Sequence, residues 1–493
     1  MSRTTPDPAL NTAVAASAEP ATRIPIALAE GDGIGPEITA AVRRILEAAG
    51  APLAYEPIVI GERAYLAGCP HGVPDEAWSA IRRCRVLLKG PITTPQGGGY
   101  KSVNVTLRKA LGLFANVRPC ASLPGASGAR AGIDLTVIRE NEEDLYAGIE
   151  HRQTPETVQC LKLVTRAGCE RIIRYAFAYA RAHNRRKITC MTKDNIMKMT
   201  DGLFHRIFDA VAAEHPEIAT EHQIIDIGAA RLATRPQAYD VIVTMNLYGD
   251  ILSDIAAEVS GSVGTAGSAN IGAQAAMFEA VHGSAPDIAG KGIANPSGLL
   301  MAAVQMLVHL GCAREASLIH NAWLRTLEEG IHTADLGASG AVGTQAFADA
   351  VAKRLGEEPQ SRPPVLYRAD ARPALPEVAE PRPEPRTRAG IDVFLHFVGS
   401  PEVLAERIRS LAPHPPLTMI TNRGVKVWPD GHPETLCTDH WRCRFLAGER
   451  EEPSFAELHA LVGRLAEAGL EVIKTEGLYR FAGRAGFSAG QGA

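Results

Sequence analysis

Arginines and small polar residues gather in one stretch of the chain, between residues 97 and 119 and directly after three glycines. They are Ser102, Asn104, Arg108 and Arg118. The N-terminus of a helix that follows a glycine turn presents N–H groups to an anion. The guanidinium group of arginine binds a carboxylate through two parallel hydrogen bonds. The stretch therefore predicts either a carboxylate-binding site or a capped surface helix with solvated arginines.

Two aspartates form a second candidate site. Asp250 and Asp254 lie four residues apart in GDILSDIAAEV, so they share one face of a predicted helix. Like charges at this spacing repel each other unless a cation lies between them. Oxygen ligands suit Mg²⁺ or Mn²⁺. The alternative is that both acids only accompany a helix N-terminus, where the dipole favours negative charge.

A short helix must position the first stretch. Ser102 is a residue type that caps a helix N-terminus, and Gly112 is one that ends a helix. Val103, Leu107 and Leu111 follow one another at intervals of four, so they form the buried face. Asn104 and Arg108 then share a different face of the same helix.

A glycine turn, GDGIG at residues 31–35, follows a predicted strand at 24–29 and opens a helix. The third glycine comes two residues after the second, whereas the GxGxxG nucleotide fingerprint requires three. No acidic residue stands at a convincing position about twenty residues further on. We therefore expect a tight turn close to a ligand and not a Rossmann nucleotide site.

Apolar runs alternate with helical patterns over residues 23–358, which indicates an α/β fold. Helices repeatedly follow strands, so parallel pairing with crossovers is expected over hairpins. Lys193 and Asn195 follow the predicted strand at 187–192. Arg139 follows another predicted strand, at 135–138.

The ends of the chain differ from this central part. Residues 1–22 are rich in Ala, Pro and Thr, and we expect them to be disordered. Residues 359–388 hold eight prolines and are typical of a semi-rigid linker. Residues 389–493 return to globular patterning, which predicts a small α+β domain. Its large aromatic residues, Trp428, Trp441 and Phe445, are expected to build a core and not a ligand site.

The composition of the chain limits the classes of partner that we expect. The 493 residues are too many for one ordinary core, and the net charge of −4 gives no reason to expect nucleic acid. No apolar run reaches the ~20 residues of a membrane span, so no membrane contact is expected. The nine cysteines form no CxxC pair, which favours reduced thiols and a cytoplasmic location.

The motifs occur together, in consistent order, in the β-decarboxylating dehydrogenases. The sequence resembles this isocitrate/isopropylmalate dehydrogenase family from about residue 24 to 353, and within it the isocitrate dehydrogenases. The motifs are GDGIGPE, KGPITTP, SVNVTLR, NVRP, VIRENEEDLYAGIE, TKDNIMK, MNLYGDILSD and EAVHGSAPDIAGKGIANP. Residues 389–493 resemble the extra domain of a bacterial subgroup with a lengthened subunit.

The resemblance implies a fold of two α/β subdomains around one cleft, which is not a Rossmann fold. The large subdomain would comprise residues 23–113 and 261–358. The small subdomain, residues 114–260, would carry the dimer contacts. A homodimer with shared active sites is the expected minimum, and the C-terminal domain is expected to serve assembly, with a tetramer as the larger form considered. A regulatory ligand site in that domain is the alternative.

The resemblance also assigns roles to matched residues. Those that would hold the substrate are Ser102, Asn104, Arg108, Arg118, Arg139 and Asn195. The catalytic pair would be Tyr146 and Lys193, the lysine coming from the neighbouring subunit. The metal ligands would be Asp250, Asp254 and the neighbouring subunit's Asp226. The cofactor contacts would be Thr94, Asn104, Glu279, His282, Gly283, Ala285, Asp287, Ile288 and Asn295.

The implied reaction is the oxidative decarboxylation of isocitrate to 2-oxoglutarate and CO₂ in the tricarboxylic acid cycle. Lys193 would accept the hydroxyl proton, Tyr146 would protonate the enol, and Mg²⁺ or Mn²⁺ would stabilise the enolate. The alternatives are homoisocitrate or another 3-substituted malate as substrate, or a non-catalytic regulatory subunit. The second alternative is disfavoured because none of these five groups has been lost: Lys193, Tyr146, Asp226, Asp250 and Asp254.

The choice of cofactor is argued from charge. Asp287 and Ile288 stand where NADP-preferring relatives usually carry lysine and tyrosine. A carboxylate can accept a hydrogen bond from the ribose 2′-hydroxyl and would repel a 2′-phosphate. The sequence therefore predicts NAD as the cofactor.

Overall fold

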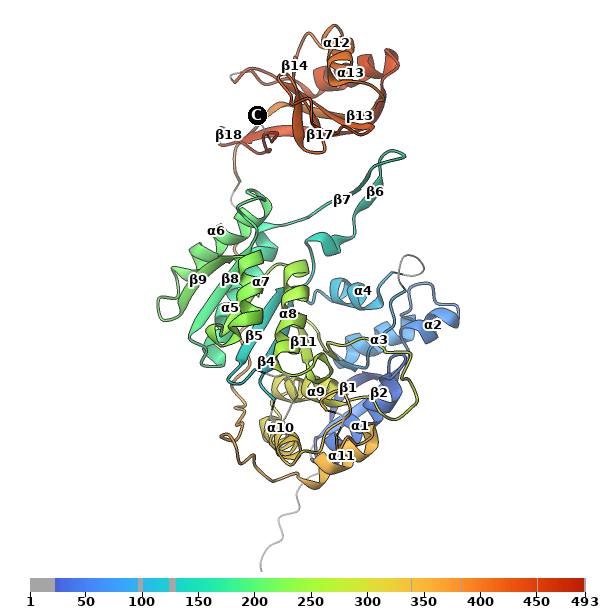
Figure 1. The fold of residues 1–493 in the computed structure, drawn as a ribbon, viewed down its shortest axis with the longest axis vertical. Coiled ribbons are helices and arrows are strands. Elements are labelled where there is room, and N and C mark those ends of the chain that lie inside the picture. The colour runs from blue at the N-terminus through green and yellow to red at the C-terminus, as the bar shows by residue number, and fades with distance from the viewer. Residues whose placement is uncertain are drawn as a thin grey trace, which may run out of the picture.

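The computed structural model describes residues 23–95, 101–123, 130–337, 339–381, 383–449 and 451–491. Two bodies follow each other along the long axis of the molecule (Figure 1). The first is built on a ten-stranded sheet and the second, at the C-terminal end, on a six-stranded sheet. The sequence prediction of disorder for residues 1–22 lies outside the described residues.

The ten-stranded sheet has the order β2-β1-β3-β12-β11-β4-β5-β10-β8-β9. Its strands are β1 (Ile24–Ala29), β2 (Leu53–Ile58), β3 (Val86–Lys89), β4 (Ala115–Ala121), β5 (Asp134–Glu140), β8 (Lys187–Thr192), β9 (Ala219–Ile224), β10 (Val241–Thr244), β11 (Gly267–Ile271) and β12 (Ala276–Ala280). Four of them, β3, β10, β11 and β12, are buried along their whole length, as expected for strands covered on both faces.

The expectation of parallel pairing is wrong at the centre of this sheet. The outer pairs are parallel, but β12 with β11, β11 with β4, and β4 with β5 are antiparallel. The connection between β11 and β12 is only four residues long, which allows a hairpin and excludes a crossover helix. These central strands join the two halves of the sheet, so one hydrophobic core extends from Ile38 in the first half to Phe177 in the second.

Helices pack on both faces of the sheet (Figure 1). Their bounds are α1 (Gly35–Ala48), α2 (Glu62–Leu66), α3 (Asp75–Cys84), α4 (Val103–Ala110), α5 (Arg166–Ala182), α6 (Thr200–Ala212), α7 (Ile225–Thr234), α8 (Asn246–Ser260), α9 (Ser297–His309), α10 (Ala313–Glu328) and α11 (Thr344–Lys353). Within the described ranges, no helix combines the length and apolarity needed to cross a membrane. All nine cysteines are free thiols.

The glycine turn after β1 packs tightly against two other loops. Gly33 has φ +58°, and a Cβ there would lie 2.0 Å from the carbonyl oxygen of Ser284. The buried Asp32 accepts hydrogen bonds from the backbone N–H groups of Glu62 and Thr93, at 3.1 and 2.9 Å. The turn therefore fixes the loop after β3 and the loop after β12, both of which carry predicted site residues.

The proline-rich segment crosses the back of the first body before it reaches the second. Its described residues between 359 and 385 form neither helix nor strand. Val365 exchanges two backbone hydrogen bonds with the side chain of Asn321 on α10, at 2.8 and 2.9 Å. The hydroxyl of Tyr367 lies 2.8 Å from Nδ1 of His320. The segment is thus docked on the surface.

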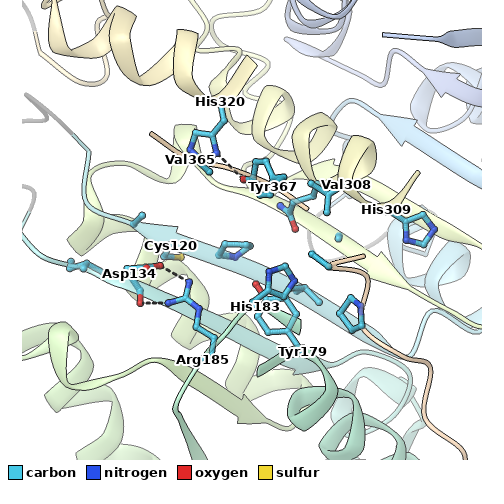
Figure 2. A pocket seen from close by; sticks show the side chains of 18 of the residues that line it. Cys120, Asp134, Tyr179, His183, Arg185, Val308, His309, His320, Val365 and Tyr367 are labelled. Atoms are coloured by element: carbon cyan, nitrogen blue, oxygen red, sulfur yellow. Dashed lines mark hydrogen bonds and ion pairs between the residues drawn. The ribbon is translucent and has the colours of Figure 1, made fainter. Parts of the chain in front are cut away.

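A cavity of about 630 Å³ lies beneath this segment. Figure 2 shows His320 and Tyr367 on one side of it, with Tyr179, His183 and Arg185 on the other. Burial lowers the pKa of both histidines to about 4, so their rings are neutral at pH 7. None of the predicted site residues lines this cavity.

The C-terminal body is an antiparallel sheet with the order β15-β14-β16-β13-β17-β18. Its elements are β13 (Arg386–His396), α12 (Pro401–Arg409), β14 (Leu417–Asn422), β15 (Val425–Trp428), β16 (His440–Leu446), α13 (Phe455–Glu467), β17 (Glu471–Phe481) and β18 (Arg484–Ala485). Trp441 and Phe445 are buried in its core and Trp428 packs against them, which confirms the prediction for these aromatic residues.

An arm connects the two bodies. β6 (Glu150–Arg152) and β7 (Val158–Cys160) form a two-stranded hairpin that extends from the first body toward the second (Figure 1). At the turn of this hairpin, the hydroxyl of Thr154 donates a hydrogen bond of 2.6 Å to the carboxylate of Asp439 in the second body. Both residues are buried, so the contact is a packed junction.

Candidate active site

The short helix α4 forms as predicted. Ser102 is its N-cap, and the Ser102 hydroxyl accepts a hydrogen bond from the N–H of Val105 at 3.4 Å. Val103 and Leu107 are fully buried, which fixes the rotation of the helix. The hydroxyl of Thr94 lies 3.4 Å from that of Ser102. The three glycines before Ser102, residues 97–99, lie outside the described residues.

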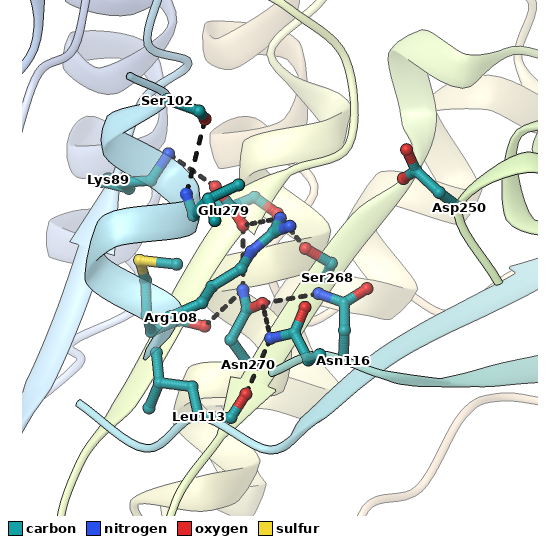
Figure 3. A network of polar contacts seen from close by, with 12 residues as sticks. Lys89, Ser102, Arg108, Leu113, Asn116, Asp250, Ser268, Asn270 and Glu279 are labelled. Atoms are coloured by element: carbon teal, nitrogen blue, oxygen red, sulfur yellow. Dashed lines mark hydrogen bonds and ion pairs between the residues drawn. The ribbon is translucent and has the colours of Figure 1, made fainter. Parts of the chain in front are cut away.

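Arg108 leaves α4 toward the sheet and ends in a buried ion triad (Figure 3). One oxygen of Glu279 lies 2.8 Å from Nη2 of Arg108, and the other lies 2.6 Å from Nζ of Lys89. Asn270 donates a further hydrogen bond to Glu279, at 2.9 Å. Burial favours the neutral acid, but the two cations outweigh it and hold the pKa of Glu279 well below its usual range.

Lys89 is a site residue that the sequence reasoning missed. It ends β3, a strand in which all four residues are buried. The available signal was a lysine that follows three consecutive buried apolar residues, because a buried charge requires a partner. The partner, Glu279, is 190 positions away and was assigned only to the cofactor.

A cavity of about 100 Å³ opens beside the triad, lined in part by Asn104, Arg108, Arg118 and His282. Three polar atoms of these residues are buried without a hydrogen-bond partner among the described residues. They are Oδ1 of Asn104, Nε of Arg108 and Nε2 of His282. Buried polar atoms almost always find a partner in a native state. The cavity is therefore suited to a polar ligand that supplies both donors and acceptors.

Arg118 and Arg139 converge on the metal-ligand candidates of α8. Nη2 of Arg118 lies 3.2 Å from Oδ1 of Asp250, and Nη1 of Arg139 pairs with the same oxygen. The hydroxyl of Tyr146 donates a hydrogen bond of 2.6 Å to Oδ2 of Asp250. Nη1 of Arg118 lies 3.5 Å from Oδ1 of Asp254. Five predicted residues are thus brought into one group.

The charges in this group are unequal. Burial opposes ionisation of Asp250, but Arg139 and Arg118 outweigh it and lower the pKa of Asp250. Burial raises the pKa of Asp254 and that of Tyr146. Burial also lowers the pKa of Arg139 to about 10. A divalent cation between the two carboxylates would stabilise the ionised form of Asp254, which burial disfavours. The all-oxygen donor set fits Mg²⁺ or Mn²⁺.

Lys193 and Asp226 form a separate group. Lys193 follows β8 directly, and its Nζ lies 3.0 Å from Oδ1 of Asp226 on α7. The Asp226 side chain is 68% exposed, and Asn195 is exposed beside Lys193. No hydrogen bond or ion pair between described residues joins Lys193 or Asp226 to the Asp250 group.

The predicted cofactor residues after β12 lie on one irregular loop. Ser284 anchors it, through a hydrogen bond of 2.9 Å with the Thr93 hydroxyl and through its carbonyl, which accepts the N–H of Ile34. Gly283 and Asp287 are exposed, while Ala285 and Ile288 are half-buried and pack on the core. Asn295 donates a hydrogen bond of 2.9 Å to Asp335.

The buried carboxyl group of Glu140 should make the stability of the folded chain depend on pH. It follows Arg139, is 4% exposed, and accepts hydrogen bonds from the N–H groups of Glu142 and Glu143. Burial raises the pKa of Glu140 from 4.5 to about 8. Between these values the folded chain holds a proton that the unfolded chain has lost. Stability should therefore fall as pH rises from 5 to 8, by about 1.4 kcal/mol per pH unit at the steepest point.

Glu140→Gln removes this titration while keeping an oxygen for the backbone N–H groups. We expect the variant to be more stable than the parent at pH 8 and to match it near pH 5, as measured by urea denaturation across this range. Glu142→Gln, at a half-buried neighbour, is the matched control. Equal pH slopes in the parent chain and in Glu140→Gln would contradict the prediction.

The comparisons with known proteins agree with this geometry. Residues 25–351 match the family described as isocitrate/isopropylmalate dehydrogenase, and residues 386–493 match the bacterial isocitrate dehydrogenase C-terminal domain. A solved structure from Thermus thermophilus superposes with a TM-score of 0.91 at 45% identity, covering 96% of each chain. The isocitrate dehydrogenase structure of Methylococcus capsulatus has a TM-score of 0.65 at 46% identity and covers 67% of this chain and 99% of its own.

Two curated relatives match almost the whole chain, and a third matches about two thirds of it. A Rickettsia felis protein named isocitrate dehydrogenase [NADP] is 52% identical over 95% of this chain and 99% of its own. A Thermus thermophilus protein of the same name is 45% identical over 95% of both chains. Subunit 2 of the mitochondrial isocitrate dehydrogenase [NAD] of Saccharomyces cerevisiae is 45% identical over 67% of this chain and 90% of its own.

The prediction of NAD as the cofactor is contradicted by these relatives, since the full-length ones are named for NADP. The prediction rested on Asp287, which the structure places on the surface of its loop. An exposed charge interacts with another at contact distance by only about 1 kcal/mol in water. Lys291 is exposed four residues further along, and a cation there can offset the repulsion of a 2′-phosphate. One exposed carboxylate does not decide the cofactor.

Proposed function

Because the chain belongs to the isocitrate/isopropylmalate dehydrogenase family, we propose that it is an NADP-dependent isocitrate dehydrogenase that needs a divalent cation. The observation that carries the proposal is the convergence of Arg118 and Arg139 on the Asp250 and Asp254 pair, beside the cavity that Arg118 lines together with Arg108. Three guanidinium groups suit a substrate with several carboxylates, and the paired acids suit the cation that such a substrate also binds.

The substrate carboxylates would be bound by the arginines, with Asn104 in the lining of the cavity and Ser102 at the N-cap of α4 close by in the chain. Nε of Arg108 and Oδ1 of Asn104 are buried without partners, so a bound ligand gains hydrogen bonds at no cost in displaced protein contacts. Arg118 is held by Asn116 and Ser253, both at 2.6 Å, which fixes its guanidinium group before the substrate arrives. Asn195 would lie at the edge of the same site.

The proton transfers are assigned to Lys193 and Tyr146. Oxidation of a 2-hydroxy acid releases the hydroxyl proton as hydride leaves the same carbon, and Lys193 would accept it. The loop that carries His282 would hold NADP⁺, which when bound would supply the hydride acceptor. Tyr146 would protonate the enol that remains after CO₂ departs, and its raised pKa keeps it protonated for this step. Asp250 and Asp254, with Asp226, would hold the cation, which when bound would supply Lewis-acid stabilisation of the developing negative charge.

The proposal is tested with the purified chain in one matrix of assays. Isocitrate, homoisocitrate and isopropylmalate are each offered with NADP⁺ or NAD⁺ and with Mg²⁺ or Mn²⁺. We expect the highest kcat/KM with isocitrate and NADP⁺, and no turnover after removal of the cation with a chelator. A higher kcat/KM with another substrate would overturn the assignment of isocitrate. No turnover with any combination would favour a regulatory subunit.

Each active site is further proposed to combine two chains. Lys193 and Asp226 make no contact with the Asp250 group among the described residues. Large apolar side chains are exposed on the segments around them. They are Ile149, Val158, Leu161, Leu163, Ile196, Met199, Ile227 and Ile251. Such a surface is typical of an interface between subunits. Assembly beyond a dimer through the C-terminal domain stays a prediction, testable by the solution mass of a chain cut within residues 359–385.

Mixing two inactive variants distinguishes shared sites from sites within one chain. Lys193→Met and Asp250→Asn should each be inactive alone. In a mixed dimer with shared sites, one site carries both substitutions and the other carries neither. Random reassociation should therefore restore about one quarter of the parent activity, because half of the dimers are mixed and each has one intact site. No recovery, with mixed dimers demonstrated by mass spectrometry, would show that each chain has its own site.

A further inference from the structure

We propose that Asp194, His205 and His222 form a binding site for a divalent transition-metal ion such as Zn²⁺, separate from the carboxylates of α8. The three residues come from three places in the fold: the loop after β8, the helix α6 and the strand β9. One ligand atom from each lies within 4.8 Å of the others. No other residues of the described chain bring three such groups this close together.

The contacts around the site hold the two imidazole rings in place. Nδ1 of His205 lies 2.7 Å from one oxygen of Asp194, and Nε2 of His222 lies 3.8 Å from the other. The two rings are stacked, with centroids 3.6 Å apart and planes 17° from parallel. The three side chains are between 17% and 26% exposed, so an ion can reach them while packing limits their motion.

The donor set selects the ion. Two imidazole nitrogens and one carboxylate oxygen suit Zn²⁺ and its neighbours in the first transition row, whereas Mg²⁺ prefers oxygen ligands alone. Ligand atoms around tetrahedral zinc are about 3.3 Å apart, so the side chains need to close by about 1.5 Å at most. Zinc at Nε2 of His222 would replace the contact of 2.8 Å that this atom makes with the Thr192 hydroxyl.

The charges of the groups agree with this assignment. Burial lowers the pKa of His222, which keeps the ring in the neutral form that binds metals. Burial opposes ionisation of Asp194, but the hydrogen bond from His205 and the other interactions with His222, His205 and Thr192 together outweigh it and lower the pKa of Asp194. The outer nitrogen of His205 lies 3.6 Å from a carboxylate oxygen of Asp209, an arrangement that orients metal-bound histidines in other proteins.

The site lies beside the residues assigned to proton transfer. Asp194 is the neighbour of Lys193 in the chain, and His222 precedes Asp226 by four residues. An ion bound here would tie the end of β8 to β9. Because none of the three ligands is among the residues that we assign to the reaction, their loss should leave the activity measured with saturating Mg²⁺ and no added transition metal unchanged.

The test uses Co²⁺ as a spectroscopic probe and Zn²⁺ as its competitor, with the carboxylate site saturated by millimolar Mg²⁺. We expect one Co²⁺ per chain with intense ligand-field bands, displaced by Zn²⁺. His205→Gln and His222→Gln should each weaken this binding by about 100-fold or more. His459→Gln, an exposed histidine on α13, is the matched control and should bind as the parent does.

A second variant separates this site from the one on α8. Asp254→Asn should keep the Co²⁺ bands, since that residue takes no part in the new site. Circular dichroism and thermal unfolding of the histidine variants show whether each is folded. The proposal is overturned if the parent chain shows no bands, if folded His205→Gln and His222→Gln keep them, or if Asp254→Asn loses them.

Discussion

Replacement of Glu279 with alanine is expected to lower the free energy of unfolding by about 3–5 kcal/mol. Glu279 is 3% exposed and is the counter-ion of two buried cations, Lys89 and Arg108. Its removal would leave both positive charges uncompensated in the interior. A buried ion pair contributes little net stability when it is complete, but loss of one partner is costly because the other charge remains desolvated.

The measurement is denaturant unfolding at neutral pH, with Glu47→Ala as the control. Glu47 pairs with Arg43 at 3.1 Å, but both side chains are more than half exposed, so its loss should cost less than about 1 kcal/mol. A cost for Glu279→Ala as small as that of the control would contradict the prediction.

Glu279 should also make the folded chain lose stability in acid. The folded-state pKa of Glu279 lies well below its usual value of 4.5, so its contribution is complete above that value. The contribution is lost as the pH falls from 4.5 toward the folded-state pKa. The parent chain should therefore lose stability over this interval more steeply than Glu279→Gln does. Equal slopes would show that another carboxylate controls acid unfolding.

Sequence periodicity predicted two strands in the parallel parts of the large sheet well. The strands β1 and β8 begin and end at the predicted residues, because each is an apolar run between clear turn signals. The strand β4 was missed because Arg118 and Pro119 interrupt its apolar pattern. In the folded chain, hydrogen bonds from Asn116 and Ser253 satisfy that arginine. The fold class itself is confirmed by the family match and by the superposition.

The strand β16 was missed for the same physical reason. Its sequence, HWRCRFL, places arginines among apolar residues, which argues against a buried strand. Arg444 is nevertheless 3% exposed, because the carboxylate of Asp392 on β13 pairs with it through two hydrogen bonds of 2.7 and 2.8 Å. Such a pair spans 52 positions of the sequence and cannot be inferred from local pattern.

The candidate site was likewise predicted where its residues belong to local motifs and missed where they meet only through the fold. Motif matches predicted the residues that the structure gathers around Asp250, because their spacing within each motif is local. The role of Glu279 as a buried counter-ion, and the presence of Lys89 beside it, depend on two strands that only the sheet order brings together. The cofactor prediction failed because it weighed one charge at a position whose exposure the sequence does not reveal.

Replacement of Lys193 with methionine is expected to lower kcat by about 10²–10⁴-fold with little change in KM for isocitrate. The lysine is assigned to proton transfer, so its loss should affect the transition state more than the bound substrate. Lys198→Met makes the same substitution five positions away at an exposed lysine and should retain activity. A similar loss in both variants would indicate a general effect of the substitution on this loop.

Two further variants separate proton transfer from the ion pair with Asp226. Lys193→Arg keeps a positive charge that can still reach Asp226, but a guanidinium group does not exchange its proton at neutral pH. It should therefore be as inactive as Lys193→Met. Lys193→Ala should regain activity on addition of ethylamine, and the recovered rate should rise with pH as the free amine forms. A fully active Lys193→Arg would mean that Lys193 acts through its charge alone, and no recovery with any small amine would contradict its role as the proton acceptor.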